Sequence, residues 1–129
     1  MSDEEATDGG IIIDRSVLDE LKTLNAPNTA DIFEQLIESY LRNSAREMVG
    51  LSEAFQKKDW PEVARVAQFL KSSSAGVGAV SFRRLLEQTE IHALASQADV
   101  LSSLMLSCET IYRHVRADLE QILADGRKR

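Results

Sequence analysis

The sequence is poor in cysteine, proline, glycine and aromatic residues. It has one cysteine, two prolines and six glycines among 129 residues, and aromatics make up 5%. The single cysteine, Cys108, excludes an intrachain disulfide framework, and nothing points to an oxidising compartment. Few prolines and glycines favour helix over strand, because these residues interrupt helices most strongly. With 43% hydrophobic residues the chain can still form a packed core, and its length suits one domain.

Clustered basic residues and long apolar runs are also missing. The net charge is −6. Duplex nucleic acid is not an expected partner of such a chain, because binding its phosphates requires clustered Lys and Arg. The basic end 127–129 is interpreted as solvated. No apolar run approaches the roughly 20 residues of a membrane span, and residues 1–10 are acidic, unlike a secretory signal. We therefore expect a cytoplasmic protein with no nucleic-acid and no membrane partner.

Apolar residues recur at helical spacing, and no segment alternates with the period of a strand. A short helix is expected after Asp14, with Val17, Leu18, Leu21 and Leu24 apolar, and 25–28 with Pro27 breaks it. A second helix covers about 29–56 and a third runs from about 60 to 76. A fourth follows Ser81, the chain turns at 97–99, and a last helix follows. The expected inward positions are Phe33, Ile37, Tyr40, Leu41, Met48, Leu51 and Phe55 in the second helix, Phe82, Leu85, Leu86 and Thr89 in the fourth, and Leu101, Leu104, Cys108, Ile111, Val115, Leu119 and Ile122 in the last.

Several polar residues are candidates for helix ends. Asp14, Asn28 and Ser81 are predicted N-caps, and Asp59 with Glu62 resembles a capping box. Gly76 and Gly78 allow the chain to leave helical geometry. The pattern predicts an all-α fold, an antiparallel up-down four-helix bundle with a short extra N-terminal helix. Residues 1–10 are predicted to be a disordered acidic leader, 11–125 the bundle and 126–129 a basic tail.

The third helix has an unusual outer face. Its buried stripe is predicted to contain Val63, Val66, Ala67, Leu70 and Val77, with Ser73 and Ser74 at its margins. Solvated helix faces are usually filled with long polar residues, whereas this one is mostly small around one central glutamine. A partner could approach such a face closely, or a neighbouring helix could cover it, and the pattern leaves both open. The residues of this face are Pro61, Ala64, Arg65, Gln68, Lys71, Ser72 and Ala75.

The segment 67–79, Ala-Gln-Phe-Leu-Lys-Ser-Ser-Ser-Ala-Gly-Val-Gly-Ala, resembles the signature of histidine-phosphotransfer domains. That signature has alanine, histidine, any residue, leucine, lysine, glycine or serine, two small residues and a glycine–alanine step. Leu85, Leu86, Thr89 and Glu90 are similar to the pattern of the family's next helix. The residues from Ile32 to Leu41, with Leu51 and Asp59, match the spacing of the preceding helix. The resemblance covers about residues 14–123 and implies the family's helical bundle.

The resemblance places Gln68 where the family has its phosphorylated histidine. Lys71 matches the lysine that helps to balance the phosphoryl charge, and Ser72 matches the small residue that allows close docking. Gly78 matches the glycine before the fourth helix, and Gly76 lies in the same motif segment. Lys71 and Ser72 are three and four residues from Gln68, so they share its helix face.

Glutamine at this position changes the chemistry. A histidine accepts phosphate because a neutral imidazole nitrogen has an available lone pair. The lone pair of a carboxamide nitrogen is delocalised into the carbonyl, so Gln68 can form hydrogen bonds but is no useful nucleophile. Docking should survive and transfer should not. Gln68 is either native, in a pseudo-phosphotransfer protein, or an engineered replacement of histidine in an active one, and the sequence does not separate these.

The resemblance implies a module of a two-component phosphorelay that binds the receiver domain of a response regulator or hybrid histidine kinase. It implies no enzyme activity, no cofactor and a monomer. The partner-binding residues would be Ala64, Arg65, Gln68, Lys71, Ser72 and Ala75, with Arg65 and Lys71 suited to an acidic receiver pocket. One rival is an active phosphotransfer protein carrying a His-to-Gln change. Another is a structural helical bundle without receiver binding.

Other candidate residues have simpler interpretations. His92 lacks the lysine and small residues of a phosphoacceptor, and His114 is expected at the surface. Apart from an occasional acidic residue, neither has a second metal-type ligand at helical spacing on its own face, so no metal site is expected. Cys108 lies on the core stripe of its helix and is expected to be inert. Trp60 is expected to pack against one end of the bundle.

Overall fold

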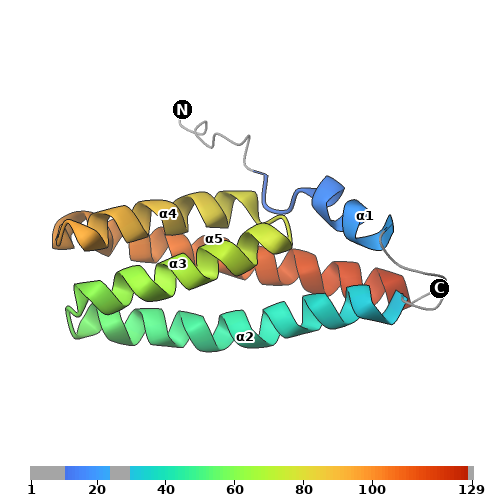
Figure 1. Cartoon of the computed structure of the whole chain (residues 1–129), viewed down its shortest axis with the longest axis horizontal. Coiled ribbons are helices and arrows are strands. Elements are labelled where there is room, and N and C mark those ends of the chain that lie inside the picture. The colour runs from blue at the N-terminus through green and yellow to red at the C-terminus, as the bar shows by residue number, and fades with distance from the viewer. Residues whose placement is uncertain (1–10, 24–29, 128–129) are drawn as a thin grey trace.

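The computed structural model describes residues 11–23 and 30–127 and consists of five helices in that part of the chain. They are α1 (Arg15–Thr23), α2 (Ala30–Gln56), α3 (Trp60–Gly76), α4 (Val80–Leu94) and α5 (Ala98–Arg127). Figure 1 shows α2 to α5 running alternately up and down as a bundle, with α1 at the end where α3 passes into α4. Consecutive long helices contact each other, and α2 also contacts α5, which closes the bundle. The predicted all-α bundle with a short N-terminal helix is confirmed.

Some expectations fall on residues that the structure does not describe. The acidic leader 1–10, the apolar Leu24, the break at 25–28 with the Asn28 cap, and the last two residues of the basic tail lie outside the described ranges. Within them, α5 continues to Arg127, past the expected end of the bundle at 125.

The N-terminal caps are partly as predicted. The carboxylate of Asp14 accepts a hydrogen bond from the Ser16 amide at 3.0 Å, so Asp14 caps α1. The carboxylate of Asp59 accepts one from the Glu62 amide at 3.2 Å and caps α3. Glu62 does not complete the capping box, because its carboxylate binds Arg65 instead. Only half of the predicted box is therefore present.

The predicted cap at Ser81 is wrong. The helix α4 begins at Val80, its N-cap position is Ala79, and no side chain caps it there. The hydroxyl of Ser81 instead donates to the backbone carbonyl of Ile11, which attaches the segment before α1 to the start of α4. Of the two glycines, Gly76 is the last residue of α3, whereas Gly78 alone has a positive φ, +75°. Gly78 is thus the residue that reverses the chain.

The core lies between α2, α3, α4 and α5, with Leu18 and Ile13 covering one end. Most predicted core positions are buried, but Met48, Phe55, Leu85, Leu104, Ile111 and Ile122 are only partly buried. On α5, Met105, Tyr112 and Leu123 take core positions that the apolar pattern did not include. The hydroxyl of Tyr112 is hydrogen-bonded to the Ser44 hydroxyl, which gives the polar end of this core residue a partner.

A buried hydroxyl pair joins α2 to α3. The Tyr40 hydroxyl and the Ser74 hydroxyl are 2.8 Å apart, and both side chains are buried. Such groups are costly to bury without a partner, and here each supplies the other. Ser74, expected at the margin of the buried stripe, is completely buried. The pair fixes how α3 rotates against α2, and therefore which of its residues face outward.

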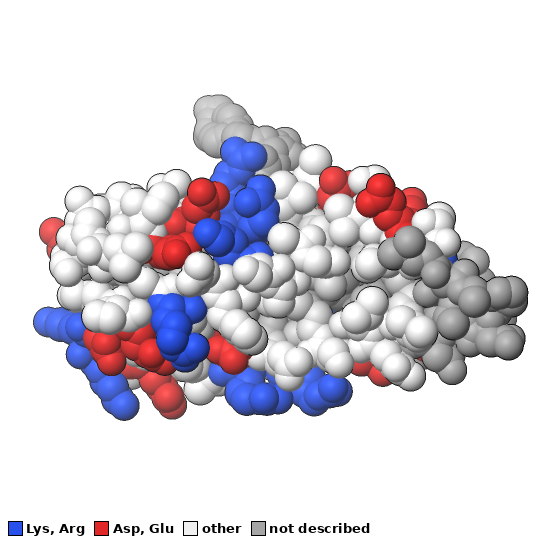
Figure 2. Space-filling model, in the orientation of Figure 1, with Lys and Arg blue, Asp and Glu red and all other residues white. Residues whose placement is uncertain are grey.

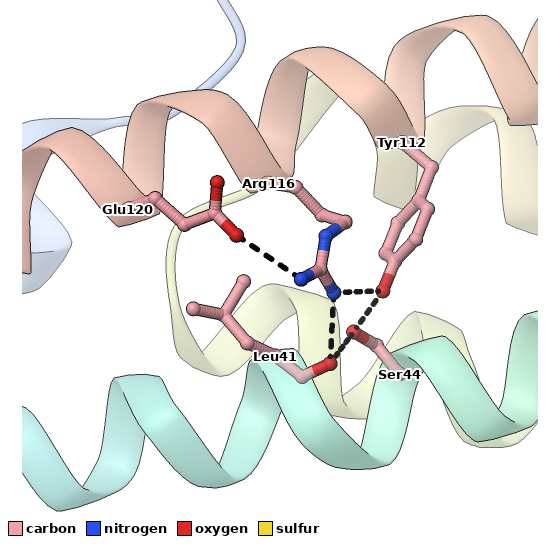
Figure 3. A network of polar contacts seen from close by, with 5 residues as sticks. All are labelled: Leu41, Ser44, Tyr112, Arg116 and Glu120. Carbon is pink, nitrogen blue, oxygen red and sulfur yellow. Dashed lines mark hydrogen bonds and ion pairs between the residues drawn. The ribbon is translucent and has the colours of Figure 1, made fainter.

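A second polar network joins α2 to α5 (Figure 3). The hydroxyls of Ser44 and Tyr112 are 2.7 Å apart, and the Arg116 guanidinium donates to the Tyr112 hydroxyl at 3.3 Å. Arg116 also donates to the Leu41 carbonyl at 3.1 Å and to the Glu120 carboxylate at 3.1 Å. All of these contacts lie across the α2–α5 interface or along α5, which makes the network a structural connection within the bundle.

Candidate functional site

The outer face of α3 presents a small polar surface centred on Gln68. Gln68, Ser72 and Ala75 are exposed. Among the residues that the structure describes, the Gln68 side chain has no hydrogen-bond partner in the chain. A free carboxamide offers both a donor and an acceptor to an approaching surface. No helix in the described part of the chain covers these three residues. The alternative in which a neighbouring helix covers this face therefore does not apply to them.

Ala64 is placed differently from the prediction. It is buried, with only 5% of its surface exposed. Ala64 lies seven residues before Lys71, which is nearly two helical turns, so both point to the same side of α3. That side faces α4, because Lys71 contacts Glu90 there. Ala64 therefore packs inside the bundle, and its assignment as an exposed partner-binding residue is wrong.

Arg65 extends from the exposed face but is already paired. Its guanidinium donates two hydrogen bonds to the Glu62 carboxylate, at 2.9 and 2.7 Å. The side chains are 62% and 41% exposed, so the pair is solvent-screened and contributes little to stability. The hydrogen bonds from Arg65 lower the pKa of Glu62. Sequence spacing of three residues was the available signal for this pair.

Lys71 is paired across helices. Its ammonium is 2.9 Å from the Glu90 carboxylate on α4, and the side chains are 28% and 18% exposed. Both groups are thus partly removed from water, unlike Arg65 and Glu62. The sequence did not indicate this contact, because the two residues are 19 positions apart and only the packing of α3 on α4 brings them together. The face around Gln68 therefore contains two cations, each matched by a carboxylate.

An apolar groove adjoins this face. Its volume is about 410 Å³, and its walls come from α1, α2 and α3. Two large apolar side chains on it are half exposed, Phe69 on α3 at 53% and Leu36 on α2 at 46%. Figure 2 shows a broad uncharged area over α2 and α3, with positive and negative side chains next to one another around it. Sequence analysis missed both residues, although Phe69 directly follows Gln68. The groove is lined by Leu21, Leu36, Tyr40, Asn43, Ser44, Glu47, Phe69, Ser73, Gly76 and Val77.

The remaining candidates lie away from this face. His92 is partly buried at the end of α4 and its Nδ1 contacts the Gln97 side-chain oxygen, and His114 is exposed on α5. Cys108 is completely buried, and burial raises the pKa of its thiol to about 11. Trp60 packs on Phe55 with ring centroids 5.9 Å apart. No three His, Cys, Asp or Glu residues are grouped as metal ligands in the described ranges.

The geometry is that of a helical bundle with an open, small-residue surface on one helix, and sequence comparison identifies its family. The Hpt domain model matches residues 35–125. The chain belongs to the Hpt domain family. The family comprises the phosphotransfer modules of phosphorelays, which are phosphoryl shuttles rather than enzymes and generally interact with receiver domains. None of the helices in the described part of this Hpt chain is long and apolar enough to cross a bilayer.

Two individual proteins are similar to this Hpt chain. Multistep phosphorelay regulator 1 of Schizosaccharomyces pombe is 25% identical over 79 residues. That match covers 61% of this chain but only 27% of the relative, so the chain corresponds to about a quarter of that protein. The crystal structure of histidine-containing phosphotransfer protein B from Pseudomonas aeruginosa has the same fold, with a TM-score of 0.82 at 21% identity. The structural match includes 88% of this chain and 96% of the Pseudomonas aeruginosa protein.

Proposed function

We propose that this Hpt chain binds receiver domains of response regulators or hybrid histidine kinases without accepting phosphate from them. The observation that carries the proposal is the exposed, unpartnered Gln68 at the centre of the small surface of α3. On the family signature this is the position of the phosphorylated histidine. A module that keeps the fold and the surface but not the nucleophile would occupy a receiver without relaying its phosphoryl group.

The chemical part of the proposal concerns the side chain of Gln68. Phosphoryl transfer to a histidine uses a ring nitrogen with an available lone pair. The amide nitrogen of glutamine lacks one, and His92 and His114 lie on α4 and α5, outside the surface around Gln68. Gln68 can still donate to and accept from a receiver's phosphorylation pocket. Binding and transfer are therefore separable in this protein.

We define the docking surface as the exposed part of α3 with the edge of the apolar groove. Its small residues allow close approach, and its two half-exposed apolar side chains suit the apolar rim of a receiver pocket. Interfaces of this type in signalling are modest in area and transient. A cytoplasmic location and a monomeric state are part of the same proposal. The docking surface consists of Arg65, Gln68, Lys71, Ser72 and Ala75 on α3 with Leu36 and Phe69.

Two alternatives from the sequence remain distinct from this proposal. A histidine in the natural protein at position 68 would make it an active relay, and Gln68→His would then restore its activity. A bundle that kept the family fold for structural reasons alone would not bind receivers. The open outer face of α3 favours binding over that structural role, because a surface without a partner gains nothing from small side chains around Gln68.

Receiver binding is tested by titrating the chain with a panel of receiver domains from the same organism, using calorimetry. We expect at least one to bind in the micromolar range that is typical of transient contacts. Ser72→Arg should weaken that binding at least about tenfold, since a long side chain at the centre of an interface prevents close packing. Ser103→Arg, at an exposed position of α5, is the matched control and should bind normally. Equal binding by both variants, or no binding to any receiver, contradicts the proposal.

A further inference from the structure

The apolar groove beside Phe69 contains a carboxylate, that of Glu47 on α2. The Glu47 side chain is partly buried, and it forms no hydrogen bond and no ion pair with the residues that the structure describes. A carboxylate that is withdrawn from water without a hydrogen bond or an opposite charge is in an unfavourable environment. The groove therefore has an unpaired negative charge next to its half-exposed apolar side chains.

The other polar side chains that line the groove all have partners within the chain. Their hydrogen bonds are between 2.7 and 3.2 Å long and join Tyr40 to Ser74, Ser44 to Tyr112, Asn43 to Arg46, and Ser73 to the Leu70 carbonyl. Glu47 differs from each of them, because its charge remains available to a molecule that enters the groove.

Two cations near Glu47 are bound to other residues. Arg65 on α3 donates two hydrogen bonds to the Glu62 carboxylate, at 2.9 and 2.7 Å. These bonds are the main reason that the pKa of Arg65 is raised, and the charge of Glu47 raises it further. The guanidinium of Arg46 donates to the Asn43 side chain at 3.1 Å. Neither guanidinium neutralises Glu47 by direct contact.

We propose that Glu47 is a specificity-determining residue, which selects receivers that carry a lysine or arginine next to the apolar side chains they place in the groove. The inference rests on the proposed function, because it names the kind of partner that fits the same docking surface. A cation against Glu47 in a partly dehydrated groove is attracted more strongly than at an open surface, whereas an acidic residue there is repelled. Such charges decide mainly between partners. The chain's own residues 1–10 are acidic in sequence, so they do not have the charge of this occupant.

The test uses the receiver that binds the unaltered chain most tightly in the calorimetric titration. Glu47→Gln keeps the size of the side chain and removes its charge. We expect this change to raise the Kd about three- to tenfold at low salt and less at high salt, because dissolved ions screen the interaction. Glu53→Gln, at an exposed position of α2 outside the groove, also removes one negative charge. This matched control should bind like the unaltered chain.

A charge exchange then identifies the partner residue. Glu47→Lys should weaken binding at least about tenfold, since two like charges would meet. Each surface lysine and arginine of the receiver is changed to glutamate in turn, and each receiver variant is titrated with Glu47→Lys. We expect one of them to regain most of the lost affinity, which a purely structural role of Glu47 would not produce.

Three results would overturn the inference while leaving the proposed function intact. The first is that Glu47→Gln binds the receiver as tightly as the Glu53→Gln control. The second is that no charge reversal in the receiver restores binding to Glu47→Lys. The third is self-association of the chain that Glu47→Lys weakens, which would assign the groove to a second copy. If no receiver binds even the unaltered chain, the proposed function fails and this inference fails with it, so the two failures are distinguishable.

Discussion

The backbone amide of Asp14 donates a hydrogen bond to the backbone carbonyl of Gly78 at 2.7 Å. This contact fastens the segment before α1 to the turn between α3 and α4. Gly78 has a φ of +75°, and a Cβ at this residue would lie 2.7 Å from the Asp14 carbonyl oxygen and 3.2 Å from the Val17 Cβ. Backbone atoms cannot move aside as a flexible side chain does, so the site accepts only glycine.

Replacing Gly78 should therefore destabilise the protein. We expect Gly78→Ala to lower the free energy of unfolding by about 2–4 kcal/mol, the sum of a left-handed alanine and a backbone clash. Chemical denaturation followed by circular dichroism measures this change. Gly76→Ala is the control, since Gly76 is helical and a Cβ there would meet nothing within 4 Å. A control variant as unstable as Gly78→Ala would contradict the assignment.

Alkaline pH should weaken the fold through Cys108. Burial raises the pKa of this thiol from its ordinary value near 9 to about 11, so the folded protein keeps a proton that the unfolded chain loses. Stability is then complete below pH 9 and falls as the pH rises toward 11. The loss amounts to about 2–3 kcal/mol for a shift of this size. Burial also raises the pKa of Tyr40, which adds to the loss above its ordinary value of 10.

Denaturation at pH 8, 9, 10 and 11 measures this dependence. Cys108→Ala removes the thiol and should make the curve less steep between pH 9 and 10, where tyrosine in the unfolded chain is only partly ionised. A free energy of unfolding that stays constant from pH 8 to 11 in the unaltered protein would contradict the burial of this group.

The hydroxyls of Tyr40 and Ser74 should be energetically coupled. Removing either one alone, by Tyr40→Phe or Ser74→Ala, leaves a buried hydroxyl short of a partner and should cost about 1–2 kcal/mol. The double variant should cost less than the sum, because neither hydroxyl then remains. A double-mutant cycle measured by denaturation gives the coupling, expected at about 0.5–1.5 kcal/mol. Additive effects would mean that the 2.8 Å contact contributes nothing.

The apolar edge of the docking surface should contribute to receiver binding. Phe69→Ala and Leu36→Ala each remove a half-exposed side chain and should weaken binding about five- to thirtyfold, as anchors of this type do. Thermal denaturation should show little change, because neither residue belongs to the core. Leu106→Ala, at a 68% exposed position on α5, is the control and should leave binding unaltered. Equal weakening by all three would show a nonspecific hydrophobic effect.

The sequence predicted the fold well because helical periodicity records which side of each helix is buried. The residues at Ile37, Leu51, Leu70, Phe82 and Val115 were all placed in the core from spacing alone, and all are buried. Periodicity gives a residue's angle on its own helix but not the distance to the next helix. Ala64 was placed outside for that reason, although the close packing of α4 covers it.

The functional surface was only partly accessible to sequence reasoning. The exposure of Gln68 and Ser72 followed from the helix face, and the structure agrees. The Lys71–Glu90 pair did not follow, because it depends on how two helices are aligned along their lengths. Phe69 was missed because helical periodicity marks the buried stripe of a helix and gives no signal for an exposed apolar side chain. Whether the surface binds a receiver stays a prediction.

The central claim is that the chain occupies receivers without taking their phosphate, and a transfer assay tests it most directly. A receiver that binds the chain is labelled with radioactive phosphate and mixed with the unaltered protein or with Gln68→His, and the label is followed on gels over time. We predict that the label stays off the unaltered protein, while Gln68→His acquires it in an acid-labile, alkali-stable form. Label on the unaltered protein would contradict the account.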